Sequence, residues 1–134
     1  MADLTISRAL NVHPDAVWRA WTTDELSVWL WPPLWETTAE IDLRVGGQYR
    51  LSSVVAHIAV SGSYLVIDAP SRLVMTWRWD GEDVETLVSV SIVETERGGT
   101  ELTVLHENFH SDDDRDSHIQ GWNDCLDRLP EVVT

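Results

Sequence analysis

Between residues 36 and 110, apolar and polar side chains alternate with a period of two, and many of the apolar ones are β-branched. Successive side chains of an extended strand point to opposite faces, so this pattern predicts strands that bury one face only. Turn sequences divide the region at Val45-Gly46-Gly47, Ala69-Pro70-Ser71, Asp80-Gly81-Glu82-Asp83 and Arg97-Gly98-Gly99. We therefore expect strands over residues 36–43, 47–54, 57–68, 71–80, 84–95 and 99–109, joined as antiparallel hairpins.

The alternation also predicts which face of each strand is buried. Charged residues such as Arg78, Glu85 and Glu101 fall on one side, and apolar residues fall on the other. A shift by one residue would reverse both sets, so the separation of the charges fixes the register. The expected inward set is Leu73, Met75, Trp77, Trp79, Val84, Val88, Val90, Ile92, Leu102, Val104 and His106.

Helical segments precede and follow these strands. Residues 4–12 alternate as an additional edge strand, after which Pro14 and Asp15 suit the first turn of a helix. Thr23-Asp24-Glu25 opens a second short helix, which Pro32-Pro33 ends. The run of acidic residues at 112–114 begins a long helix, and Pro130 is expected to end or kink it. Its apolar stripe comprises Ile119, Trp122, Leu126 and Leu129.

These elements predict an α+β protein with one domain over residues 1–134: a curved antiparallel sheet of six to seven strands, two short helices after the first strand, and one long C-terminal helix.

Composition excludes several classes of function. The formal net charge is -14, from 23 acidic and 9 basic residues, and this charge repels nucleic acid and anionic lipid. No apolar run approaches the roughly 18 residues that cross a bilayer, so we expect no membrane insertion. Cys125 is the single cysteine, which excludes an internal disulfide and cysteine-cluster metal sites. With no signal-peptide pattern at the N-terminus, the expected location is cytoplasmic.

Tryptophan is unusually frequent. The chain has 8 in 134 residues, and five lie between Trp18 and Trp35. Such rings can be core packing alone, or they can line a cavity for a flat apolar ligand. Trp29 and Trp31 fall at the corner between helix and strand, where a pocket entrance would lie, while Trp18 and Trp21 suit helix packing.

The polar candidates are few. His106 is the one ionisable residue on the predicted inward face; it is either a hydrogen-bonded structural residue or a polar anchor or acid–base group at a cavity floor. His110, His118 and the nearby aspartates are interpreted as a solvated helix start, because adjacent acids cannot converge on one metal ion. We expect no metal and no cofactor. Cys125 lacks a nucleophile motif and is interpreted as a small buried residue.

Several stretches resemble a known family. They are residues 15–22 with Trp29-Leu30-Trp31-Pro32, the glycine turn at 42–47, the hairpin at 62–77, and the last strand and helix from Gly98-Gly99 to Leu129. In this order they resemble the START-like (birch-pollen-allergen-like) helix-grip superfamily, and within it the bacterial family named for the activator of the heat-shock-protein-90 ATPase. The family usually has two adjacent tryptophans and Gly-Pro after its second helix, and Pro130 is a further departure.

The resemblance implies a cavity between the concave face of the sheet, the short helices and the long helix. It does not imply activation of a heat-shock ATPase, since in the eukaryotic namesake that activity depends on a further domain, which these residues do not include. Fold and function separate readily.

Three functions remain open. The first is binding of a small apolar or aromatic molecule, lipid-, steroid- or polyketide-like, without catalysis. The second is a polyketide cyclase or aromatase, and the third is a co-chaperone-like or regulatory protein-interaction module; a homodimer is also left open. The expected cavity lining is Trp29, Trp31, Tyr49, Tyr64, Met75, Trp77, Trp79, Val90, His106, Trp122 and Leu126.

Overall fold

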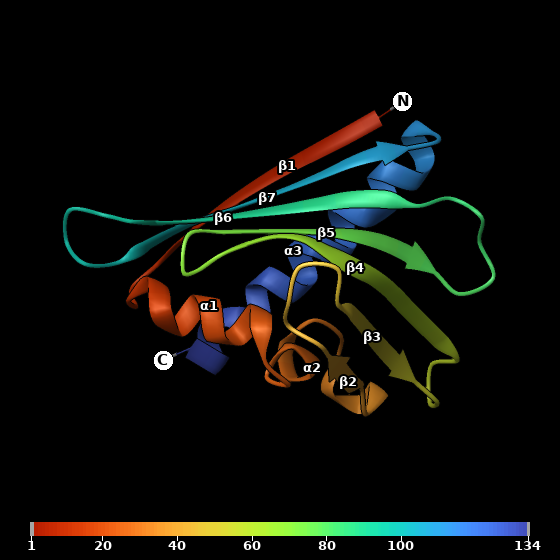
Figure 1. Cartoon of the computed structure of the whole chain (residues 1–134), viewed down its shortest axis with the longest axis horizontal. Helices are drawn as coiled ribbons and strands as arrows, with labels where there is room; N and C mark the ends of the chain where they lie inside the picture. The colour runs from red at the N-terminus through yellow and green to blue at the C-terminus, as the bar shows by residue number, and fades with distance from the viewer. Residues whose placement is uncertain (1, 134) are drawn as a thin grey trace.

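The computed structural model describes residues 2–133 and contains one seven-stranded antiparallel sheet with the strand order β1-β7-β6-β5-β4-β3-β2 (Figure 1). The elements in chain order are β1 (Ala2–Leu10), α1 (Pro14–Thr22), α2 (Leu26–Trp29), the 3-10 helix η1 (Pro33–Trp35), β2 (Thr38–Ile41), β3 (Gln48–Ser53), β4 (Ile58–Asp68), β5 (Arg72–Trp79), β6 (Thr86–Glu94), β7 (Thr100–Phe109) and α3 (Asp112–Val133).

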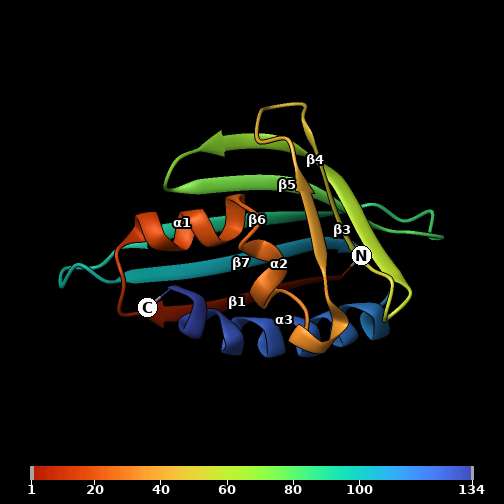
Figure 2. The ribbon, with the colours of Figure 1, turned by 90° about the horizontal axis from the view of Figure 1, so that it is seen from below.

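The predicted α+β helix-grip architecture is confirmed. The sheet curves around α3, and Figure 2 shows all three α-helices on the same face of the sheet. β1 closes one edge by pairing with β7, so the first and last strands of the chain lie side by side. No helix within residues 2–133 is long and apolar enough to cross a membrane.

The predicted register is also confirmed for nine of the eleven residues expected to face inward; Trp79 and Val84 are half-buried, and Val84 lies before the first residue of β6. Leu73, Met75 and Trp77 of β5 are buried, as are the inward residues of β6 and β7, while Arg78, Glu85 and Glu101 are exposed. Gly98, in the turn between β6 and β7, has a φ of 80°, a conformation that favours glycine. The core lies between this face and the stripe of α3, and the largest fully buried side chains include Trp21, Trp29, Phe109, Leu126 and Leu129.

Most predicted strand ends lie within two residues of the observed ones, and two of the differences have a clear physical cause. The strand expected from residue 36 begins at Thr38, because Pro33–Trp35 forms a 3-10 turn and Glu36 takes a left-handed φ of 50°. Pro130 does not end α3, which continues to Val133. A proline removes its own N–H from the helix ladder and its ring crowds the carbonyl four residues earlier. The helix continues because Leu129 and Val133, on either side of Pro130, are buried and hold the last turn in the core.

Candidate functional site

An aromatic pocket lies between the end of α2, the last residues of β5 and the middle of α3. It is a partly open cavity of about 220 Å³. Four tryptophans from three separate parts of the chain form most of its wall. The lining is Leu30, Trp31, Trp77, Trp79, Ser117, His118, Gly121, Trp122 and Cys125.

The four indoles of this pocket form a continuous row of ring contacts, from Trp31 through Trp79 and Trp77 to Trp122. Trp31 stacks on Trp79 with ring centroids 6.0 Å apart and an interplanar angle of 14°. Trp79 meets Trp77 edge to face at 5.6 Å, and Trp77 lies against Trp122 at 5.5 Å. Offset-stacked and edge-to-face arrangements are the favourable ones for aromatic pairs. Because each ring rests on the next, the wall is held in place before any ligand arrives.

Each indole is positioned by its own element. Trp77 and Trp79 are two residues apart on β5, so both point to the inner face of the sheet. Trp31 follows α2, whose C-terminal end is fixed by the Arg128 guanidinium of α3. That group donates to the backbone carbonyls of Trp29 and Leu30, at 3.0 Å each, so the long helix anchors the segment that carries Trp31.

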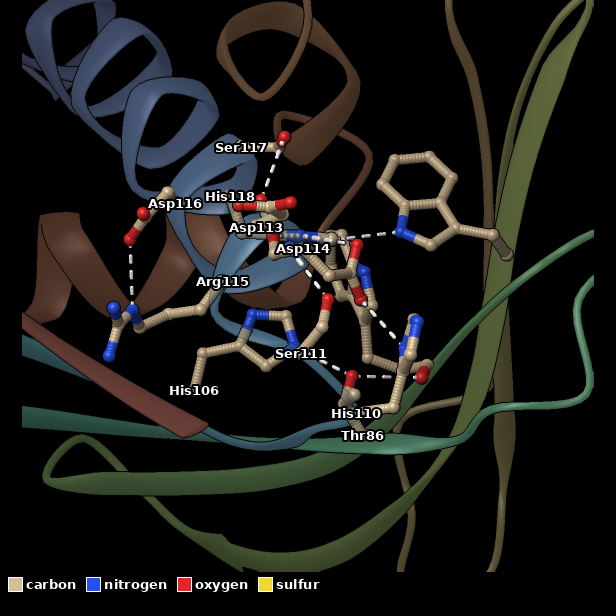
Figure 3. A network of polar contacts seen from close by, with 12 residues as sticks. Thr86, His106, His110, Ser111, Asp113, Asp114, Arg115, Asp116, Ser117 and His118 are labelled. Carbon is tan, nitrogen blue, oxygen red and sulfur yellow. Dashed lines mark hydrogen bonds and ion pairs between the residues drawn. The ribbon is translucent and has the colours of Figure 1, made fainter. Parts of the chain in front are cut away.

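His118 is the imidazole on the pocket wall. The Trp79 Nε1–H donates to its Nε2 at 3.0 Å, and its Nδ1 lies 2.8 Å from the backbone carbonyl of Asp114. An indole N–H can only donate, so Nε2 accepts and Nδ1 carries the proton in a neutral ring. Figure 3 shows His118 on α3 above the first turn of the helix, close to Asp114.

His106 lies behind the pocket wall and is fully buried. Its Nδ1 accepts from the Trp122 Nε1–H at 3.0 Å, and its Nε2 lies 2.6 Å from the Thr86 hydroxyl. The Thr86 hydroxyl in turn donates to the Trp77 carbonyl at 3.1 Å. Burial, with a smaller contribution from His118, lowers the pKa of His106 to about 3. The neutral ring therefore ties α3 to β5 through β6 and β7 and does not line the pocket.

The remaining chemical groups of the lining are unreactive. Burial raises the pKa of the Cys125 thiol to about 12, and the S–H donates to the Trp122 carbonyl. A protonated thiol is a poor nucleophile. The Ser117 hydroxyl donates to the Asp113 carbonyl. Within residues 2–133 no three His, Cys, Asp or Glu side chains gather in a way that could hold a metal ion.

The comparisons with known proteins agree with this fold. The family model described as "Activator of Hsp90 ATPase homolog 1-like protein" matches residues 11–134. The chain belongs to this family. No curated protein matches the sequence.

Solved structures of the family's helix-grip type match almost the whole chain. A protein from Chromobacterium violaceum is 23% identical, with a TM-score of 0.83 over 98% of this chain and 96% of that one. An HSP90 activator from Plasmodium falciparum is 21% identical, with a TM-score of 0.80 over 99% and 96%. A protein in the dynemicin biosynthetic locus is 18% identical, with a TM-score of 0.81 over 96% of this chain and 46% of that one. At these identities the likeness shows the fold alone.

Within this member of the family, the residues predicted to line a cavity separate into two groups. Trp31, Trp77, Trp79 and Trp122 come together in the pocket. The others lie outside its lining: Trp29, Tyr49, Tyr64, Met75, Val90, His106 and Leu126. Trp29 is fully buried rather than at an entrance, because its Nε1–H donates to the Ala20 carbonyl and its ring meets Trp21 edge to face at 4.9 Å.

Tyr49 belongs to a different concavity, a groove of about 840 Å³ beside β2, β3 and β4. The groove is larger than the aromatic pocket, but its lining is largely polar and charged and includes Arg44, Arg50 and Glu85. Arg44 pairs with Asp42, and Arg50 pairs with Asp80. These solvated pairs make the groove a wet surface feature, and the aromatic pocket, with its mainly apolar lining, is the better candidate for an apolar ligand.

Sequence reasoning missed five lining residues, Leu30, Ser117, His118, Gly121 and Cys125. A signal for part of this set was present: His118, Trp122 and Cys125 stand at helical spacings of four and three and share one face of α3. Because an acidic run precedes His118, the sequence pattern assigned His118 to a solvated helix start and not to the pocket. The segment around Leu30 reaches the pocket through tertiary packing, for which the local sequence gives no pattern.

Gly121 leaves the pocket mouth open. A Cβ at this position would meet no atom within 4 Å. A glycine inside a helix costs about 0.5–1 kcal/mol relative to alanine. We therefore expect Gly121→Ala to raise the free energy of unfolding by about this amount, measured by urea denaturation. A lower free energy in the variant would show that the space around Gly121 is filled.

Proposed function

We propose that this protein binds a small apolar or aromatic molecule in the pocket between α2, β5 and α3. The observation that carries the proposal is the convergence of four indoles on one partly open cavity whose lining includes no Asp, Glu, Lys or Arg. Pockets for small ligands are concave and mainly apolar, with few polar groups. The side chains around this cavity meet that description, and the outer groove does not.

The size of the pocket narrows the class of ligand. A volume of about 220 Å³ lies below the roughly 300–1,000 Å³ of pockets that hold drug-sized molecules. The tryptophans themselves occupy much of the space that the helix-grip fold encloses. A flat molecule of roughly one or two rings fits such a site better than a whole steroid or a long acyl chain.

The lining supports binding more than catalysis. Acid–base or nucleophilic catalysis needs a group that can exchange a proton or attack near neutral pH. The raised pKa of Cys125 argues against a thiolate, and the acceptor nitrogen of His118 is already bonded to Trp79. A cyclase activity stays a prediction.

The test is to fill the mouth of the pocket without disturbing the core. Because a Cβ at residue 121 would meet no atom within 4 Å and Gly121 is part of the pocket lining, we expect Gly121→Leu to fold and to place its side chain at the entrance. We expect naphthalene to quench or shift tryptophan emission in the wild type, and Gly121→Leu to weaken its binding at least about tenfold, a change of roughly 1.4 kcal/mol.

The control is Gln120→Leu, which adds the same side chain at an exposed position of α3 outside the lining. It should bind naphthalene as the wild type does. Equal binding by all three proteins would contradict the proposed site, and the absence of any emission change in the wild type would contradict the proposed function.

Location and self-association also stay predictions. We propose a cytoplasmic protein, and the buried, unpaired Cys125 supports a reducing compartment. A homodimer is supported by exposed apolar side chains on neighbouring segments. Leu34 and Val54 are each 85% exposed, and the hydrogen bond from the Ser53 hydroxyl to the Trp35 carbonyl joins the two segments that carry them.

A further inference from the structure

The mouth of the aromatic pocket is bordered by carboxylates of α3. Ser117 and Gly121 line the pocket and are exposed. Residues three or four positions apart on a helix are neighbours on its surface, so Asp113 lies beside Ser117 and Asp124 lies beside Gly121. The Ser117 hydroxyl donates to the Asp113 carbonyl at 3.1 Å (Figure 3). The two aspartates therefore flank the mouth along the helix.

These two carboxylates are not neutralised by the rest of the fold. Arg115 is the nearest arginine in the sequence to Asp113, and its guanidinium pairs instead with Asp112 at 3.9 Å and with Asp116 at 3.0 Å. Among residues 2–133, no ion pair involves Asp113 or Asp124, and both are exposed. Both negative charges are therefore available to a cation in the water at the mouth.

A third carboxylate lies at the same end of the pocket. The Asp114 Oδ1 is 3.6 Å from the Nδ1 of His118, which lines the pocket. The hydrogen bond from Trp79 keeps this imidazole neutral, so it does not cancel the charge of Asp114. Over residues 112–127 the helix carries six aspartates and one arginine, and the whole chain has a formal net charge of -14. Charge of one sign around a cleft raises the local concentration of the opposite ion.

The positive charge nearest to the pocket lies at its other end. Arg128 is one helical turn beyond Cys125, and its guanidinium donates to the carbonyls of Trp29 and Leu30 at the end of α2. The lining itself includes no arginine or lysine. A cationic group is therefore favoured at the end formed by Ser117 and Gly121, where the carboxylates are, and opposed at the end near Arg128.

We propose that the ligand of this pocket is an aromatic amine in its cationic form, with the ring among the indoles and the ammonium group at the mouth, facing Asp113 and Asp124. This inference rests on the proposed function, because it names the ligand class of the same pocket. Burial of the ring provides the apolar contribution. The ammonium group stays hydrated at the mouth, so it gains the attraction of the carboxylates without the large cost of burying a charge.

The test compares three naphthalene probes of similar shape by isothermal titration calorimetry at pH 7 and low salt. 2-Naphthylmethylamine is a cation at this pH, 2-naphthylmethanol is neutral and 2-naphthoate is an anion. We expect the wild type to bind the ammonium compound about three- to tenfold more tightly than the alcohol, the range for one or two exposed ion pairs, and to bind the carboxylate more weakly than the alcohol. In 1 M NaCl the Debye length falls to about 3 Å, so most of this preference should disappear.

Two double variants assign the preference to the mouth. Asp113→Asn with Asp124→Asn removes both charges from exposed positions, and an asparagine at 124 can still accept from the Gln120 amide. The ratio of the dissociation constants for alcohol and amine should fall below about two. Glu96→Gln with Glu101→Gln is the matched control, because it removes the same charge at exposed positions outside the lining; the ratio should stay at its wild-type value.

Equal affinity of the wild type for the amine and the alcohol would overturn the proposed ligand class and leave the pocket standing. A preference that survives in the Asp113 and Asp124 variant, or that falls equally in the control, would overturn the role of these two carboxylates. Failure of the wild type to bind any of the three probes would overturn the proposed function together with this inference.

Discussion

Trp122→Ala is expected to lower the free energy of unfolding by about 3–5 kcal/mol, the largest effect of any single substitution considered for this protein. The side chain is 3% exposed and joins α3 to three other parts of the fold. It stacks on Trp21 at 5.8 Å, lies against Trp77 at 5.5 Å and donates to His106. Its removal leaves a cavity and also strips His106 of a buried partner, and both changes destabilise.

Trp79→Ala is the comparison that shows how far the loss of stability depends on the burial of the tryptophan. Trp79 also contacts two other indoles, stacking on Trp31 and meeting Trp77 edge to face, but it is only half-buried, so its loss should cost clearly less. Guanidinium unfolding of both variants measures the difference. A loss below about 1 kcal/mol for Trp122→Ala would mean that the helix does not pack on the sheet as described.

The second large effect is a dependence of stability on pH. His106 is neutral in the folded protein, with its pKa lowered to about 3 by burial, while an unfolded chain has the ordinary value near 6.5. As the pH falls below about 6.5, His106 therefore becomes protonated in the unfolded state but stays neutral in the folded state. Between pH 7 and pH 5 this linkage should cost the folded protein about 2 kcal/mol, and the cost should keep growing until about pH 3.

His106→Gln provides the comparison, because an amide can accept and donate without titrating. Its free energy of unfolding at pH 7 should be lower, since two hydrogen bonds are rearranged. From pH 7 to pH 5, however, the free energy of unfolding of the variant should fall by about 2 kcal/mol less than that of the wild type. The two proteins share all other histidines, so parallel pH profiles would show that His106 titrates normally in the folded state.

The sequence predicted the sheet and α3 well because their signals are periodic. The alternation along β5 to β7 separated buried Trp77 and His106 from exposed Arg78 and Glu101. A register shifted by one residue would have placed the charged side chains in the core, so the pattern allowed one register only. Pro130 was expected to end or kink α3, but it does not end the helix, which continues to the buried Val133.

The site was predicted less completely, because it depends on which residues converge from different elements. Trp77, Trp79 and Trp122 could be placed on the inward faces of their strand and helix. Nothing local distinguishes Trp31 in the wall from Trp29 in the core, since both are buried and only two positions apart. Likewise, the hydrogen bond between Trp79 and His118 joins residues 39 positions apart and has no local signal.

We propose that the pocket of Trp31, Trp77, Trp79 and Trp122 binds a small apolar or aromatic molecule. The eight indole N–H groups of the chain give one resonance each in a nitrogen–proton correlation spectrum, assigned by single Trp→Phe variants. On titration with naphthalene, the four pocket indoles should shift together in a saturable manner, and Trp18, which lies on α1 outside the pocket lining, should not. Resonances that stay in place at saturating probe, or shifts at Trp18 without shifts at Trp77 and Trp79, would contradict the claim.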